Sequence, residues 1–182
     1  QAQLGIDRIA QDEWAVRSHE RAARATADGS ATAEIVVIDV PQRGGPVRVT
    51  DDEGVRPGTG TSSLAALRPA FATDGTITAG NASQLSDGAA AIVLTTARTA
   101  TDRGLPVIGR IIGSASVAGP DPSLLHRPSD AVHRAAKRAG LAAAGFDRYE
   151  INEAFASVVI ASHRALGIDP ERVNVLGGAI AL

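Results

Sequence analysis

Two short segments of the sequence combine residue types and positions that suit chemistry. The first is Asn152-Glu153-Ala154-Phe155, which we place where a short strand over 149–152 ends and a helix over 153–166 begins. In open α/β sheets, ligands and catalytic groups gather at the carboxyl ends of strands. A buried asparagine there is costly unless its amide is fully hydrogen-bonded, so Asn152 is predicted to hold a water or a substrate oxygen. Capping of the following helix by Asn152 explains the same residue type about equally well.

The second segment is Thr78-Ala79-Gly80-Asn81-Ala82-Ser83, in which small side chains follow one another. Such a series lets a narrow ligand lie against the backbone, and the hydroxyl of Ser83 can donate or accept a hydrogen bond. A tight corner between two strands has the same composition. From composition alone, this structural interpretation is the favoured one.

Composition excludes several classes of site. The 182 residues include no Cys, which excludes a disulfide, a thiolate metal site and a cysteine nucleophile within this chain. The histidines lack metal-ligand spacing, and the glycine-rich stretch over 58–62 lacks the lysine of a phosphate loop, so no metal or P-loop site is predicted. The net charge of −2 and the absence of a long apolar run argue against nucleic acid or a membrane as partners.

The elements that would position these segments alternate along the chain. A helix is predicted over 6–28 with Asp7 as its N-cap, and Arg17, Arg21 and Arg24 recur on one face of it. We interpret that face as solvated, with a contact surface for an anionic ligand or partner as the alternative. A hairpin is predicted from strands over 34–40 and 47–50 joined by a turn over 42–45.

The remainder of the chain mixes short helices with β-rich segments, which indicates the α/β class. Ser62 or Ser63 is the expected cap of a short helix. Further helices are expected over 96–103 and 129–139, the latter capped by Ser129 or Asp130, and strands over 76–78, 89–95, 106–118 and 173–175.

Taken together, five segments resemble the thiolase family, acyltransferases that make or cleave 3-ketoacyl-CoA. They occur in family order and at family-like spacing, at Gln11–Ala25, Arg68–Phe71, Asp74–Leu94, Asn152–Ala156 and Val173–Leu182. The resemblance implies an α/β fold with the layered αβαβα thiolase architecture, here incomplete. Residues 1–84 would be part of the coenzyme-A-binding loop domain, 85–105 the end of the first core half, and 106–182 the beginning of the second.

The resemblance also implies roles for individual residues. Asn152 matches the asparagine that positions a water in the oxyanion hole, and Ser83 matches the serine that contacts the pantetheine arm of coenzyme A. Ala82, Ala154 and Phe155 match the walls of the same tunnel, and Arg56 and Ser63 match positions near the adenine end. Coenzyme A is then a substrate, with no other cofactor implied. A homodimer or homotetramer is implied, and we expect a cytoplasmic protein acting in lipid metabolism such as fatty-acid β-oxidation.

The chain departs from the family in the residues that react. Thiolases use two cysteines and the histidine of a GHP motif, whereas this chain has no cysteine and stops after Gly177-Gly178-Ala179-Ile180-Ala181-Leu182. Segment 126–131 also differs, and Leu176 favours the degradative direction. We therefore expect the intact protein to be a thiolase and this chain alone to be inactive. The alternatives are a non-catalytic thiolase-like module that binds acyl-CoA or a partner, and another α/β nucleotide-binding enzyme, for which a GxGxxG is missing.

Overall fold

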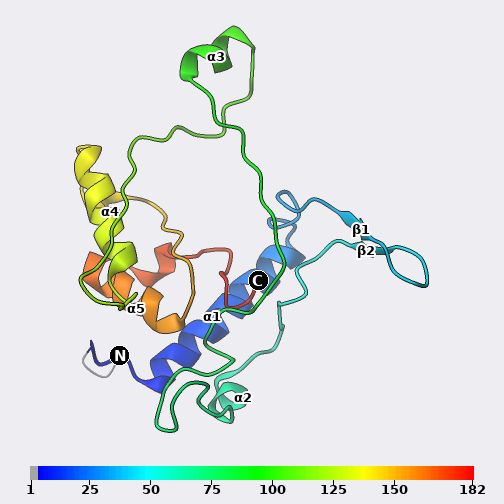
Figure 1. Cartoon of the computed structure of the whole chain (residues 1–182), viewed down its shortest axis with the longest axis vertical. Coiled ribbons are helices and arrows are strands. Elements are labelled where there is room, and N and C mark those ends of the chain that lie inside the picture. The colour runs from blue at the N-terminus through cyan, green and yellow to red at the C-terminus, as the bar shows by residue number, and fades with distance from the viewer. Residues whose placement is uncertain (1–3) are drawn as a thin grey trace.

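A long helix, α1 (Arg8–Ala27), runs through the body of the structure, a computed structural model that describes residues 4–182 (Figure 1). The side chain of Asp7 accepts a hydrogen bond from the Ala10 amide at 2.8 Å, which confirms the predicted N-cap. Gly29 adopts a positive φ of 82° one residue after the C-cap Asp28, a conformation that glycine favours. The helix therefore begins and ends close to its predicted limits.

Two further helices pack in series beside α1. Helix α5 (Ala156–Leu166) contacts α1, and α4 (Arg127–Arg138) contacts α5 (Figure 1). Trp14 and Ala15 of α1 and Val159 and Ile160 of α5 belong to the same buried cluster. Burial of such apolar side chains contributes roughly 1.5–3 kcal/mol each for the large ones, so the α1–α5 contact is the centre of the fold.

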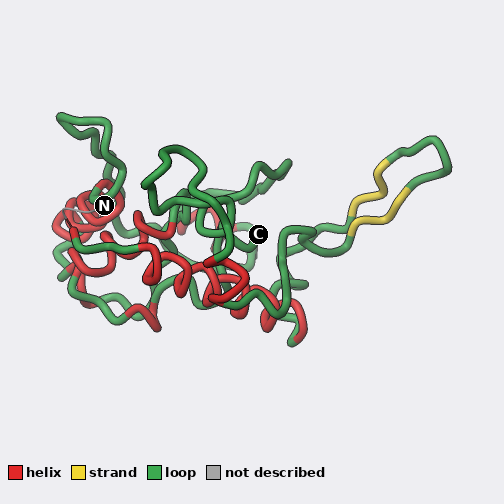
Figure 2. The backbone as a smooth tube through the Cα atoms, turned by 90° about the horizontal axis from the view of Figure 1, so that it is seen from below, coloured by secondary structure: helices red, strands yellow, loops and turns green. Residues whose placement is uncertain are grey.

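The predicted hairpin is present but shorter than expected. Strands β1 (Ile38–Val40) and β2 (Val47–Val49) pair antiparallel, with Ile38 opposite Val49 and Val40 opposite Val47. The Gly45 amide donates to the Gln42 carbonyl at 3.1 Å and so closes the turn. The ribbon projects away from the helices in both views (Figures 1 and 2).

The expected strands over 89–95 and 106–118 are wrong. Within residues 4–182 the only sheet is the β1–β2 ribbon, so the layered αβαβα arrangement is not formed by the described residues. A strand needs hydrogen-bond partners on a neighbouring strand, and these two segments find none there. They run as long connections to the outlying helix α3 (Ala97–Asp102), with Val93 91% and Ile108 106% exposed (Figure 1).

The strands expected over 76–78, 149–152 and 173–175 are reduced to isolated bridges. Tyr149 and Val173 form one parallel bridge, and Thr78 pairs with Pro69. Helix α5 begins at Ala156, three residues later than predicted, after Phe155 in an extended conformation.

Two predicted caps are also wrong. Helix α4 begins at Arg127 after His126, because Pro128 suits the first turn of a helix better than its interior, so neither Ser129 nor Asp130 is the cap. Helix α2 (Thr61–Ala65) has Gly60 as N-cap, and Ser63 lies inside the helix. Two 3₁₀ turns complete the elements, η2 (Ala143–Gly145) and η3 (Pro170–Arg172). None of the helices over residues 4–182 has the length and hydropathy needed to cross a bilayer.

Candidate functional site

The structure brings the two chemically suggestive segments together. Ala82 and Phe155 form an antiparallel bridge, although they are far apart in the sequence. The Ser83 amide donates to the Ala154 carbonyl at 3.2 Å, and the Ala156 amide donates to the Asn81 carbonyl at 2.9 Å. Backbone hydrogen bonds thus join the segments directly, and they form one site rather than two.

The first segment is anchored to α1 through Asn81, whose side chain is fully buried. Its Nδ2 donates to Asp12 Oδ1 at 2.9 Å and to the Thr76 carbonyl at 3.0 Å, while its Oδ1 accepts from the Thr78 amide at 2.9 Å. Asp12 is in turn paired with Arg8 at 2.7 Å. The segment is therefore a tight corner, as composition favoured, and the corner carries Ala82 and Ser83 to the second segment.

Asn152 is exposed, so the expectation of a buried asparagine is wrong. Its neighbours Ile151 and Glu153 are buried, at 5% and 1% exposure. Successive side chains of an extended backbone point to opposite sides, so burial of these two turns Asn152 outward. Within residues 4–182 the Asn152 amide has no hydrogen-bond partner, and it does not cap α5. Its donors and acceptor are available to water or a ligand.

Glu153 is a residue of the site that sequence reasoning left without a role. Its carboxylate accepts hydrogen bonds from Trp14 Nε1 at 2.8 Å, Ser18 Oγ at 2.7 Å, Asn174 Nδ2 at 2.9 Å and the Ile180 amide at 3.1 Å. Glutamate is rarely buried, so its type alone predicts a surface position. The one available signal was its place between a strand end and a helix start.

Asn174 is a second residue of the site that was missed. It adopts a positive φ of 49°, which Asn tolerates better than most residues. Its Oδ1 accepts from the Ile151 amide and its Nδ2 donates to the Ile151 carbonyl, both at 2.8 Å. The amide side chain therefore replaces a strand partner for the residue that precedes Asn152.

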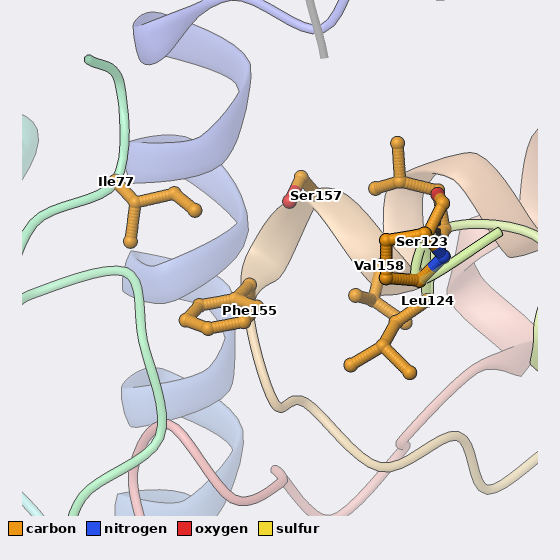
Figure 3. Close-up of a pocket in the computed structure, with 8 residues that line it drawn as sticks. Ile77, Ser123, Leu124, Phe155, Ser157 and Val158 are labelled. Atoms are coloured by element: carbon orange, nitrogen blue, oxygen red, sulfur yellow. Dashed lines mark hydrogen bonds between the residues drawn. The ribbon is translucent and has the colours of Figure 1, made fainter. Parts of the chain in front are cut away.

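A cavity of about 330 Å³ lies beside the second segment (Figure 3). Ile77 and Phe155 face it from one side and Leu124 and Val158 from the other. Phe71 contacts the edge of Phe155, with ring centroids 6.0 Å apart. Of the predicted tunnel walls, Phe155 lines this cavity, whereas Ala82 and Ala154 form the backbone junction next to it.

Arg56 and Ser63 take no part in the backbone hydrogen bonds of this junction: Arg56 lies beside α1, and Ser63 lies in α2. The Arg56 amide donates to Nδ1 of His19 at 3.3 Å, and Ser63 Oγ donates to the Gly60 carbonyl at 2.7 Å. Both side chains are exposed. Burial and the nearby Arg56 charge lower the pKa of His19 from its ordinary value, which favours the neutral ring that accepts this bond. A second cavity of about 310 Å³ lies between α1 and α2.

The arginine face of α1 matches neither prediction in full. Arg17 and Arg21 both pair with Glu171, and Arg21 is buried and also donates to the carbonyls of Val173 and Asn174. Only Arg24 is exposed to solvent. Two of the three guanidinium groups therefore attach α1 to the turn around η3. No cluster of metal-ligating side chains is found within residues 4–182.

Comparisons with known proteins show similarity to one family over almost the whole chain. A model of the thiolase N-terminal domain matches residues 1–98, and one of the thiolase C-terminal domain matches residues 105–182. A "Probable acetyl-CoA acetyltransferase" of Mycolicibacterium smegmatis is 48% identical over 176 residues, which are 96% of this chain and 45% of that protein. The "3-ketoacyl CoA thiolase 1, peroxisomal" of Petunia hybrida is 48% identical over 98% of this chain and 40% of its own length.

A solved structure extends the similarity to the backbone. The crystal structure of the Bacillus anthracis acetyl-CoA acetyltransferase has a TM-score of 0.94 and 40% sequence identity, over 100% of this chain and 46% of that one. The chain thus spans a little under half the length of the relatives that it matches. Because the two domain models together match almost every residue, this chain belongs to the thiolase family.

Proposed function

We propose that the protein containing this chain is a thiolase-type acyltransferase, which transfers an acetyl or acyl group reversibly between coenzyme A thioesters. The observation that carries the proposal is the junction of the Asn81–Ser83 corner with the Ala154–Ala156 segment, which follows the exposed Asn152 and whose Phe155 lines an apolar cavity. In the degradative direction, coenzyme A cleaves a 3-ketoacyl-CoA to acyl-CoA and acetyl-CoA. Fatty-acid or related lipid metabolism is the process we assign to it.

Asn152 supplies the proposed oxyanion contact. Cleavage of the bond between C2 and C3 of a 3-ketoacyl thioester places negative charge on the thioester oxygen of the departing acetyl unit. A water held by the Asn152 amide can donate a hydrogen bond to that oxygen. A fixed donor of this kind stabilises the transition state by about 3–4 kcal/mol in comparable sites. The outward orientation of Asn152 supports this role because its amide is not engaged within residues 4–182.

The surrounding residues suit the arm of coenzyme A. Ser83 is exposed and offers a hydroxyl to the pantetheine amides, while Ala82, Ala154 and Phe155 provide small or apolar surface beside it. Arg56 and Ser63 would lie near the adenine end, where the exposed guanidinium of Arg56 suits a phosphate. Coenzyme A is a substrate in this proposal, and no metal or other cofactor is assigned.

The remaining parts of the proposal concern the whole protein. Nucleophilic catalysis needs an activated nucleophile and a base, and we place both outside these 182 residues, which contain no cysteine. Residues 1–84 are assigned to the coenzyme-A-binding loop domain, 85–105 to the first core half and 106–182 to the second. A homodimer or homotetramer and a cytoplasmic location complete the proposal. Sedimentation of the full-length protein and cell fractionation test these two assignments.

Thiolysis of acetoacetyl-CoA by the full-length protein tests the function. Asn152→Ala is expected to lower kcat by about 10²–10³-fold, the loss typical of one oxyanion contact. Ser83→Ala is expected to raise the KM for coenzyme A several-fold, since its role is binding. Gln42→Ala removes an exposed amide from the β1–β2 turn and is the matched control, with no expected effect. Coenzyme A binding without turnover by the wild type would instead identify a non-catalytic thiolase-like module.

A further inference from the structure

The buried carboxylate of Glu153 directly follows Asn152 and joins distant parts of the chain. One oxygen, Oε1, accepts from Trp14 Nε1 on α1 at 2.8 Å and from Asn174 Nδ2 at 2.9 Å. The side chain is 1% exposed. Hydrogen bonds to a charged acceptor are about twice as strong as those between neutral groups. Oε1 therefore ties the residue after Asn152 both to α1 and to the Val173–Asn174 segment.

The other oxygen, Oε2, holds the turn near the carboxyl end of the sequence. It accepts from the Ile180 amide at 3.1 Å and from Ser18 Oγ at 2.7 Å. Ser18 Oγ in turn accepts from the Gly178 amide at 3.1 Å, and the bond that it donates to Glu153 is shorter than its 3.4 Å contact with the Gly178 carbonyl. A single carboxylate thus reaches two positions of the Gly177–Ile180 turn, one directly and one through Ser18.

All four partners of Glu153 act as donors, and this set matches a group that only accepts. No Arg or Lys pairs with Glu153 within residues 4–182. A charge buried without a counter-ion is costly unless its hydrogen bonds are complete, as they are here. A glutamine would turn its NH₂ group toward two of the four donors and lose at least one bond, because among them only the Ser18 hydroxyl can also accept. The pattern therefore selects glutamate at this position.

The same contacts fix the backbone on both sides of Asn152. The Asn174 side chain binds the amide and the carbonyl of Ile151, and the same side chain also donates to Glu153. Residues 151 and 153 are thus anchored inward through one amide group. Asn152 lies between them and projects outward, so its direction depends on anchors that it does not itself touch.

Packing adds a second constraint on the turn. A Cβ added at Gly178 would lie 2.4 Å from the carboxylate carbon of Glu153, and one at Gly177 would lie 2.7 Å from Cβ of Ala22 on α1. Real Cβ atoms do not approach other atoms so closely. The two glycines therefore let the turn pack directly against Glu153 and α1, at a fixed position relative to Asn152.

From these contacts we infer that Glu153 is a positioning residue of the thiolase reaction. It fixes Asn152 relative to the Gly177–Ile180 turn, and it acts on the reaction through Asn152 rather than by touching the substrate. The inference rests on the proposed function, because it assigns Asn152 the oxyanion contact. It also has a part that is independent of activity, namely that the carboxylate holds the turn.

The test uses the full-length protein with Glu153→Gln and, as matched control, Tyr149→Phe, which removes one partly buried hydrogen bond to the Ala143 carbonyl. In thiolysis of acetoacetyl-CoA, Glu153→Gln is expected to lower kcat about 10–100-fold with KM unchanged within about twofold. In the Asn152→Ala background, the same substitution is expected to change kcat less than about threefold, since two residues that act as a unit are not additive. Tyr149→Phe is expected to leave kcat unchanged.

Hydrogen exchange supplies the readout that needs no activity. Amides of residues 176–182 are expected to exchange at least about tenfold faster in Glu153→Gln, with α4 unchanged. If Glu153→Gln does not fold, Ser18→Ala takes its place in both measurements. We expect faster exchange of the Gly178 amide and a decrease in kcat of about 3–10-fold. Unchanged kcat, or kcat losses that multiply with those of Asn152→Ala, would overturn the inference. An inactive wild type would overturn the proposed function instead, and unchanged exchange at 176–182 would then overturn the inference independently.

Discussion

Two regions of the molecule have similar amino-acid types but differ in burial. One is the contact between α1 and α5, and the other consists of the extended segments 85–96 and 103–118. Val159 and Ile160 of α5 are 0% and 3% exposed, whereas Val93 and Ile108 are 91% and 106% exposed. Both regions are rich in the β-branched and aliphatic residues that favour burial. The difference lies in the partners, because α5 has α1 and α4 beside it and the extended segments have no paired strand within residues 4–182. Residue type sets the tendency to be buried, and the presence of a neighbour decides whether it is.

We expect the largest effect on stability from a substitution in the core between α1 and α5. Ile160→Ala is expected to lower the free energy of unfolding by about 2–5 kcal/mol, because it removes packed methyl groups and leaves a cavity. Ile108→Ala in the 182-residue chain is expected to change it by no more than about 0.5 kcal/mol, as for an exposed position. Urea unfolding followed by circular dichroism measures both. Similar costs at the two positions would show that segment 103–118 is packed in solution, and the comparison would fail.

We expect the second largest effect on stability from a substitution of Arg21, the buried arginine of α1. Arg21→Met is expected to cost about 1.5–3 kcal/mol, since the carbonyls of Val173 and Asn174 lose a charged donor. Arg24→Met, three residues along the same helix and exposed, is expected to cost less than about 0.5 kcal/mol. The same urea experiment compares them. An equal cost at Arg24 would mean that the face as a whole, rather than the Arg21 contacts, holds the helix.

The side-chain N-caps of two α-helices allow a packed helix to be compared with an outlying one. Asp7 caps α1, and Thr96 caps the six-residue α3 by accepting from the Thr99 amide at 3.1 Å. Asp7→Ala is expected to lower global stability by about 1 kcal/mol. Thr96→Ala is expected to speed amide exchange in α3 while leaving global unfolding unchanged, because α3 adds little to the core. A global loss from Thr96→Ala equal to that from Asp7→Ala would contradict this distinction.

The smallest expected effect depends on pH. Burial, followed by the Arg56 charge, holds the pKa of His19 below its ordinary value of 6.5. As pH falls through that value, the unfolded chain therefore takes up a proton before the folded one, so stability present above pH 6.5 decreases on acidification. His19→Gln is expected to reduce the fall in Tm between about pH 8 and pH 5. The exposed His133→Gln is the control, and an equal reduction by it would remove His19 as the cause.

His163 is expected to behave in the same direction. It stacks on Trp14 with ring centroids 5.7 Å apart, and burial, followed by the Arg164 charge, lowers its pKa as well. The double variant, His19→Gln with His163→Gln, should therefore show a smaller fall in Tm between about pH 8 and pH 5 than either single variant. A fall in Tm as large as that of the wild type would show that other titratable groups dominate the loss of stability at acid pH.

Local signals account for the parts of the fold that the sequence predicted well. The Asp7 cap and the turn at Gln42–Gly45 both act within a few residues of themselves, and the structure confirms them. The expected strand over 89–95 was wrong because a strand also requires a partner, and no property of its own residues states where that partner lies. Secondary structure that depends on distant pairing is therefore the part that local patterns describe least well.

The candidate site also has features that the local sequence predicts and features that depend on distant contacts. The two motifs and their family were recognisable, and their roles in binding and catalysis stay predictions. The orientation of Asn152 was wrong because it depends on the burial of Ile151 and Glu153, and a glutamate is ordinarily expected at the surface. Four donors from three distant segments reverse that expectation for Glu153. Only the assembled structure brings those donors together.

The indole of Trp14 has a practical consequence as well. It is the single Trp in the 182-residue sequence, and it contacts the Glu153 carboxylate, the His163 ring and the Arg17 guanidinium, the last at 5.6 Å. Its fluorescence emission therefore reports on one place, the meeting point of α1, α5 and the segment that carries Asn152. A shift in its emission wavelength would follow the assembly of that junction in real time, with no label attached and no assay of turnover.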